Sequence, residues 1–236
     1  EDTAAKLLKT PPVTEILAGC EIAMRASEEG QQGPYMPFYQ FYSEVQEKGI
    51  DPYLPAVAAG EEGTLSQGAA LFQESRLVGF LDEEETDTLL MLRGKKPSGA
   101  ITALRSQEEG GNVTFTLDTC RLTLHTALTP QGQVQGTLSL RTEVMVSELE
   151  GDQPLLSQEG HRQLESLCSA ELIQRGQALL QKLQKEFACD PLGLGLDLSR
   201  RQPTEWEQIK DQWHTFFSQA DLDLSVQVQV TGTGRM

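Results

Sequence analysis

Three histidines are the first candidates for acid–base or metal chemistry in this chain of 236 residues: His125, His161 and His214. None belongs to an HExxH or HxH pattern, and none shows a local His–Asp–Ser arrangement. His125 does not share the apolar positions of its alternating segment, so we expect it to face solvent. His161 stands at a predicted helix start, and His214 follows Trp213. The local sequence therefore predicts no catalytic histidine, and only a site assembled from distant positions stays open.

Two runs of acidic residues, Asp82–Glu85 and Glu61–Glu62, are the next candidates, because paired carboxylates perform acid–base catalysis or bind cations. Asp82–Glu85 precedes an apolar stretch, and acidic side chains there stabilise the positive end of a helix dipole. The ligand order of an EF-hand loop is missing. We therefore interpret Asp82–Glu85 as a solvated helix start, and we predict no catalytic residue and no metal site.

The four cysteines, Cys20, Cys120, Cys168 and Cys189, are widely spaced and include no CxxC pair. This spacing matches neither a metal site nor a disulfide framework. We predict free and mostly buried thiols, although the sequence leaves a single bridge open.

Three short patterns invite a functional interpretation. Gly193–Gly195 lacks the third glycine and the Lys-Ser/Thr ending of a phosphate loop, so we predict a turn and no cofactor. The sequon at Asn112–Thr114 is expected by chance and receives no weight. Trp206 and Trp213 lie two helical turns apart, and we favour core packing over an exposed anchor for a partner.

Composition excludes several classes of function. The chain has 38% hydrophobic residues, enough for a core, and a net charge of -16, which disfavours nucleic-acid binding. The same charge opposes adsorption to an anionic membrane, so membrane residence would need a tether or a protein partner. The sequence has no apolar run long enough to span a bilayer and no lipobox. Because it starts at Glu1 inside a predicted helix, we expect it to be trimmed from a longer protein.

The spacing of apolar residues predicts a first domain over residues 1–96. Phe38, Phe41, Tyr42 and Val45 fall on one face of a predicted helix that Gly49 ends. Strands follow, the last two joined by a hairpin turn at Gln73–Ser75. The predicted helices are Glu1–Lys9, Thr14–Arg25, Pro37–Lys48 and Thr86–Arg93, and the predicted strands are Leu54–Ala58, Gly68–Phe72 and Arg76–Leu81.

The second predicted domain covers residues 97–236. Two long alternating segments flank a turn at Pro130–Gly132, with a bulge expected near Thr119–Arg121, where the apolar phase shifts. A long helix over Ser157–Phe187, a shorter helix over Pro203–Phe217 and a strictly alternating strand over Leu222–Val230 follow. This order predicts an α+β fold: two domains, the second an antiparallel sheet with a long and a short helix packed on one face.

A series of local features resembles the Ger(x)C family, the C subunits of spore germinant receptors (GerAC/GerBC-like). Its order and spacing over roughly residues 65–232 are more specific than any one fragment. The features are Gly68–Phe72, Arg76–Leu81, Glu85-Thr86, Leu89–Arg93, the long helix, Asp190–Gly195, Trp206 with Trp213, and the Val226–Val230 strand.

The resemblance implies a non-enzymatic spore germination lipoprotein on the outer face of the spore inner membrane. It implies A and B receptor subunits as protein partners and a lipid anchor outside this chain. It brings no catalytic, cofactor or metal residues with it. The chain departs from the full family pattern because the signal, the lipobox and the first domain are missing from it.

Three hypotheses of function follow. The leading one is a receptor subunit that acts through protein–protein contacts. The second is a small-molecule binding module with the germinant in a cleft between the two domains. The third, a hydrolase built from scattered acidic residues, has the weakest support because no local pattern groups them.

Overall fold

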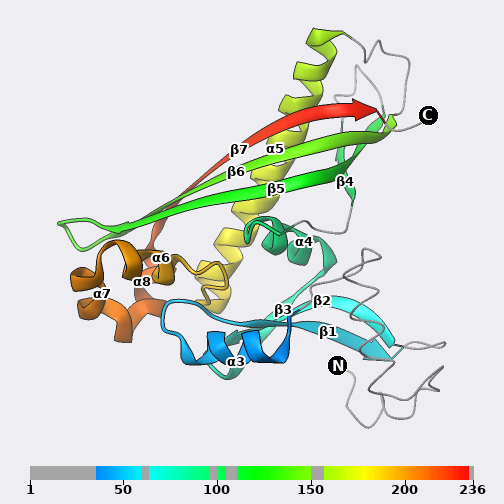
Figure 1. The fold of residues 1–236 in the computed structure, drawn as a ribbon. Helices are drawn as coiled ribbons and strands as arrows, with labels where there is room; N and C mark the ends of the chain where they lie inside the picture. The colour runs from blue at the N-terminus through cyan, green and yellow to red at the C-terminus, as the bar shows by residue number, and fades with distance from the viewer. Residues whose placement is uncertain (1–35, 60–63, 96–99, 105–110, 150–156, 234–236) are drawn as a thin grey trace.

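The computed structural model describes residues 36–59, 64–95, 100–104, 111–149 and 157–233. They form two sheets connected and covered by helices (Figure 1). The helices predicted over Glu1–Lys9 and Thr14–Arg25 lie outside the described residues. The first sheet has the order β1 (Tyr53–Ala59), β2 (Thr64–Gln73), β3 (Arg76–Leu81), and the second β4 (Ala100–Leu104), β5 (Asn112–Leu128), β6 (Val134–Leu149), β7 (Asp221–Thr233).

The second sheet confirms the α+β class, with one correction to its strand directions. β4, β5 and β6 pair antiparallel, but β7 lies parallel to β6. The reason is the long helix α5 (Gln158–Lys182), which carries the chain back along the sheet, so that β7 begins beside the start of β6. The register between β5 and β6 shifts between Leu117 and Thr119, so the bulge lies immediately before the predicted region Thr119–Arg121.

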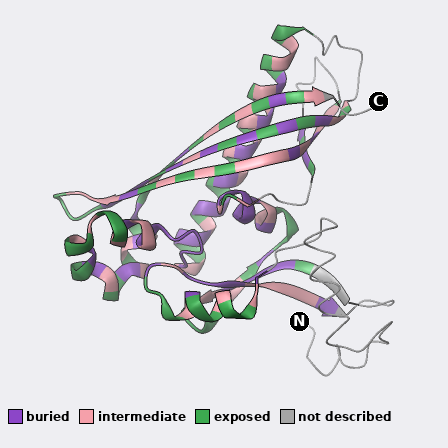
Figure 2. Ribbon diagram, in the orientation of Figure 1, coloured by how far each residue is buried: buried purple, intermediate pink, exposed green. Residues whose placement is uncertain are grey.

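Alternation along β6 separates a buried face from an open face (Figure 2). Even-numbered residues from Val134 to Val146 are buried, whereas their odd-numbered neighbours are exposed or half-buried. α5 covers the buried face with the predicted stripe, which includes Leu164, Cys168 and Leu172. The opposite face of the sheet carries polar side chains.

Helix side chains bind backbone groups along the outer edges of the long strands. At β7, Ser169 Oγ donates to the Val226 carbonyl (3.0 Å), and Glu165 Oε1 accepts from the Val230 N–H (3.0 Å). At β5, beyond the reach of the short β4, Asp197 Oδ2 accepts from the Thr126 N–H (2.7 Å). These contacts satisfy polar backbone groups that the sheet leaves unpaired.

α3 (Phe38–Gln46) forms where a helix was predicted, but it ends at Gln46, three residues before the predicted stop. Gly49, with a φ of 91°, lies in the turn that follows the helix. Its predicted apolar face is partly wrong, because Phe38 and Tyr42 are 76% and 59% exposed. The buried position is Glu44, whose carboxylate pairs with Arg93 at 2.7 Å. The spacing of apolar residues could not predict that a charged residue of this helix is buried, because the burial of Glu44 depends on its ion pair with Arg93.

α4 (Glu83–Met91) starts at the acidic run, as predicted. Asp82 is the N-cap: its side chain accepts from the Glu85 N–H (2.8 Å), and Glu85 Oε2 accepts from the Asp82 N–H (3.1 Å). Glu85 also pairs with Lys182 of α5 at 2.6 Å. The carboxylates of Asp82–Glu85 thus cap a helix and hold it against α5.

Replacing Asp82 by Ala is expected to lower the free energy of unfolding by about 1 kcal/mol, because the helix start loses its capping acceptor. Urea unfolding followed by circular dichroism measures the change. Glu83→Ala, one residue on and exposed, is the control and should change stability by less than about 0.5 kcal/mol. Equal effects of the two substitutions would contradict the capping role.

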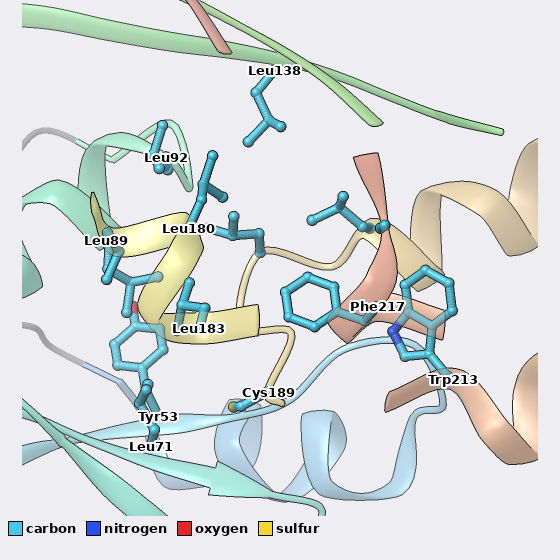
Figure 3. Close-up of a cluster of buried hydrophobic side chains, with 14 of the residues drawn as sticks. Tyr53, Leu71, Leu89, Leu92, Leu138, Leu180, Leu183, Cys189, Trp213 and Phe217 are labelled. Carbon is cyan, nitrogen blue, oxygen red and sulfur yellow. The ribbon is translucent and has the colours of Figure 1, made fainter. Parts of the chain in front are cut away.

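One core joins the two predicted domains (Figure 3). Tyr53, Leu71 and Leu89 pack in one cluster with Leu138 of β6 and with Leu183, in the π-helical turn η1 (Leu183–Phe187) that ends the long helix. The division at residues 96 and 97 stays a prediction. In the described chain, buried side chains from both sides of that position share this cluster.

The predicted helix over Pro203–Phe217 is correct in extent but is interrupted. A 3-10 turn, η2 (Lys210–Gln212), separates α7 (Pro203–Ile209) from α8 (Trp213–Gln219), and α6 (Leu194–Arg201) precedes them. Trp206 and Trp213 are both buried, with ring centroids 5.3 Å apart in an edge-on arrangement. The prediction of core packing for both tryptophans is confirmed.

Candidate functional site

A cleft of about 340 Å³ opens where the end of α3, the β2–β3 turn and the η2–α8 segment meet. Its walls come from both predicted domains, and its rim is charged: Lys48 of the α3–β1 loop pairs with Asp211 of η2. The lining residues are Val45–Asp51, Glu74, Ser75, Lys210, Asp211, Trp213 and His214.

Asp51 is the buried carboxylate at the base of this cleft. Its oxygens accept from the backbone N–H of Asp190 (2.8 Å) and of Glu74 (3.1 Å). His214 Nε2 lies 3.0 Å from Asp51 Oδ2. One side chain thereby connects the β2–β3 turn, the segment after the long helix, and α8.

Asp190 is the second buried carboxylate, and it orders the chain from the turn at residues 191–192 to the first turn of α6. It accepts from the N–H groups of Gly193 (2.9 Å) and Gly195 (3.0 Å) and from Trp213 Nε1 (3.1 Å). Burial raises the pKa of Asp190 to about 6, and the hydrogen bond from the Gly195 N–H opposes that rise. The turn predicted at Gly193–Gly195 is only partly correct: the turn lies at residues 191–192, Gly193 is the N-cap of α6, and Gly195 is in the first turn of that helix.

His214 closes the cluster from the solvent side, with 30% of its side chain exposed. The hydrogen bond with Asp51 raises the pKa of His214 above its ordinary value of 6.5, and partial burial opposes this. The imidazolium form donates to Asp51 and neutralises a carboxylate that would otherwise be buried without a counter-charge.

We expect His214 to make stability depend on pH. Because its folded pKa is raised, its contribution is fully present below pH 6.5 and is lost as the pH rises through the folded pKa. Urea unfolding at pH 6 and at pH 8.5 should show the wild type losing more stability on alkalinisation than His214→Gln. His125→Gln, at an exposed position of β5, is the control and should keep the wild-type difference.

The groups of the buried cluster are engaged in contacts within the chain. Burial raises the pKa of the Cys189 thiol well above its ordinary value, so the thiol is a poor nucleophile at neutral pH. Cys189 Sγ lies 3.4 Å from the Phe72 carbonyl oxygen. Among the described residues, no group of three His, Cys, Asp or Glu side chains is placed to hold a metal ion.

The other sequence candidates lie apart from the cleft. His125 is exposed on β5, as predicted, and His161 lies in the first turn of α5. Cys120, Cys168 and Cys189 are free thiols, as predicted. Cys20 and Glu61–Glu62 lie outside the described residues.

Local patterns missed the pairing of Asp51 with His214 because 163 positions separate them. One signal was present in the sequence. Asp51 and Asp190 each precede a proline inside an apolar stretch, which is an unusual setting for an acidic side chain.

Comparison with known proteins places the chain in a family. A family model described as spore germination B3/GerAC-like, C-terminal, matches residues 67–234. The chain belongs to this family. The resemblance read from the sequence is thus confirmed, and the GerAC-like match covers all the strands from β3 onward.

Three curated relatives come from Bacillus subtilis (strain 168). Spore germination protein B3 is 23% identical over 77% of this chain and 49% of its own length, and spore germination protein YndF is 23% identical over 77% and 45%. Putative spore germination protein YfkR is 23% identical over 81% and 51%. The GerAC-like chain thus spans about half the length of the curated relatives it matches.

A solved structure supports the fold. The crystal structure of the GerBC protein superposes with a TM-score of 0.70 at 18% identity, over 98% of this chain and 67% of that one. In the described part of the GerAC-like chain, no helix is long and apolar enough to cross a membrane.

Proposed function

We propose that this GerAC-like chain is a non-catalytic part of a spore nutrient-germinant receptor and acts through contacts with membrane-embedded A and B subunits. A lipid anchor outside this chain would hold it at the outer face of the spore inner membrane. The observation that carries the proposal is the family match over residues 67–234, with relatives named as spore germination proteins.

The chemistry of the cleft supports a non-catalytic role. Asp51 and Asp190 each accept three hydrogen bonds from groups of their own chain. Because these bonds occupy both carboxylates, neither is free to act as a general base towards a substrate. The nearby thiol of Cys189 is buried. The net charge of -16 favours a tether or partner over direct adsorption to an anionic membrane.

Deleting the gene in the spore-forming organism that encodes it tests the proposal. Spores without the protein should lose their response to at least one nutrient and still germinate under a non-nutrient treatment. In the wild type, the tagged protein should co-purify with polytopic membrane proteins from detergent-solubilised spore membranes. An unchanged nutrient response together with recovery in the soluble fraction alone would refute the proposal.

A second candidate function is supported by the cleft itself. Its volume of about 340 Å³ suits a small polar molecule, and residues from both predicted domains line it. Binding there would raise the melting temperature with ligand concentration. A nutrient screen by thermal shift, repeated on His214→Gln, decides this candidate: a shift lost in the variant supports it, and no shift with any nutrient contradicts it.

A further inference from the structure

Two arginines face each other on the open face of the second sheet. Arg121 of β5 is the register partner of Arg141 of β6, and Gln227 of β7 is the next partner along the row. Both arginines are exposed. They share the parity of the other exposed residues of β6, so their side chains stand on the face away from α5.

Neither arginine has a partner within the described chain. No hydrogen bond or ion pair joins either guanidinium to a described residue, whereas Arg93, Arg175 and Arg201 each pair with a carboxylate. Like charges directly opposite each other destabilise an antiparallel pair. The chain as a whole carries a net charge of -16, so two neighbouring cations without an anionic partner are unusual in it. An anion bound between them would remove their mutual repulsion.

The pair lines a hollow of about 310 Å³. Thr119 and the amides of Gln227 and Gln229 add uncharged donors around it. Thr142 also lines the hollow, but its hydroxyl already donates to the Thr119 carbonyl (2.7 Å). Glu143 is the acidic side chain of the lining, and it forms no ion pair with either arginine among the described residues.

We propose that this hollow binds the oxyanion of a small molecule, a carboxylate or a phosphate, between Arg121 and Arg141. A guanidinium is a planar fork of N–H donors that matches two oxygens of such a group, and two forks on adjacent strands enclose it from both sides. The oxyanion neutralises the opposed cations and relieves their repulsion. The carboxylate of Glu143 repels an anion, so we expect the affinity to be modest. Because the charges are exposed, we also expect the affinity to fall as ionic strength rises.

The test is an NMR titration of the arginine Nε–Hε signals at constant ionic strength. Inorganic phosphate is one arm and succinate the other. Saturable shifts of Arg121 and Arg141 with phosphate alone assign the site to phosphate groups, and shifts with succinate alone assign it to carboxylates. Saturation by both supports a general oxyanion site, and saturation by neither overturns the proposal.

Substitutions in the hollow should change the affinity for the anion in opposite directions. Arg121→Gln and Arg141→Gln should each weaken binding roughly tenfold, the effect of losing one charge-assisted contact. Glu143→Gln should strengthen it several-fold by removing the repelling carboxylate. Arg200→Gln, at an exposed position of α6, makes the same charge change elsewhere and should leave binding unchanged. If Arg200→Gln weakened binding as much as Arg121→Gln, the effect would be general charge and the site would be refuted.

Discussion

Asp190→Ala is expected to lower the free energy of unfolding by about 4 kcal/mol, among the largest effects of a single substitution in this chain. Alanine leaves three buried donors without an acceptor: the N–H groups of Gly193 and Gly195 and Trp213 Nε1. Each unsatisfied buried donor costs about 1–3 kcal/mol, and removal of the buried carboxylate partly offsets the sum. Urea unfolding at neutral pH measures the loss.

Two further variants identify the cause. Asp190→Asn should cost about half as much, because the amide keeps one oxygen acceptor for these donors. Asp223→Ala, at an exposed position of β7, should change stability by less than about 0.5 kcal/mol. An Asp190→Ala variant as stable as Asp223→Ala would show that the turn does not depend on this carboxylate.

The same aspartate predicts a pH dependence. The folded protein holds the Asp190 proton up to a pKa of about 6, whereas the unfolded chain releases it near 3.8. Between these values the folded state binds more protons, so this contribution to stability falls as the pH rises, by about 3 kcal/mol in all. Asp190→Asn should show a shallower fall than the wild type over that interval.

Gly195→Ala is the second substitution with a large expected effect, about 3 kcal/mol or more. A Cβ at this position would lie 2.5 Å from the Gly49 Cα and 2.7 Å from Trp213 Cε2. The Gly49 carbonyl also accepts from the Leu196 N–H at 2.8 Å, so the loop after α3 is held directly against the start of α6. A backbone neighbour cannot change rotamer to make room, which makes overpacking costly here.

Gly232→Ala is the matched control, because no atom lies within 4 Å of the added Cβ and its backbone has no left-handed φ. Urea midpoints of the two variants compare them directly. Gly49→Ala meets the same contact from the other side, at 2.6 Å from the Gly195 carbonyl carbon. Its cost and that of Gly195→Ala should be non-additive in the double variant. Additive costs, or a Gly195→Ala midpoint equal to that of Gly232→Ala, would contradict the close approach.

Periodicity predicted the parts of the fold that depend on one element at a time. Alternation marked β7, and the three-to-four spacing of Leu164, Cys168 and Leu172 marked the face of α5 that is buried. These signals can be found within one element, because a helix or strand that buries one face carries apolar residues at the period of that secondary structure.

Distant polar pairings could not be predicted in this way. Glu44 and Asp51 are charged residues whose burial depends on Arg93 and His214, and no local period links the partners. For the same reason apolar spacing alone assigned Phe38 and Tyr42 to the interior. The parallel direction of β7 was also missed, since alternation is the same in both directions.

The capped edges of the second sheet restrict how a partner can approach. Adding a strand to an open edge is a common way for a sheet to recruit another chain. Here Glu165 and Ser169 occupy backbone groups of β7, and Asp197 does so at the end of β5. A strand could pair at those positions only by first displacing α5 or α6 from them. We therefore expect association at these edges to proceed through side-chain surfaces, with the sheet closed to β-augmentation there.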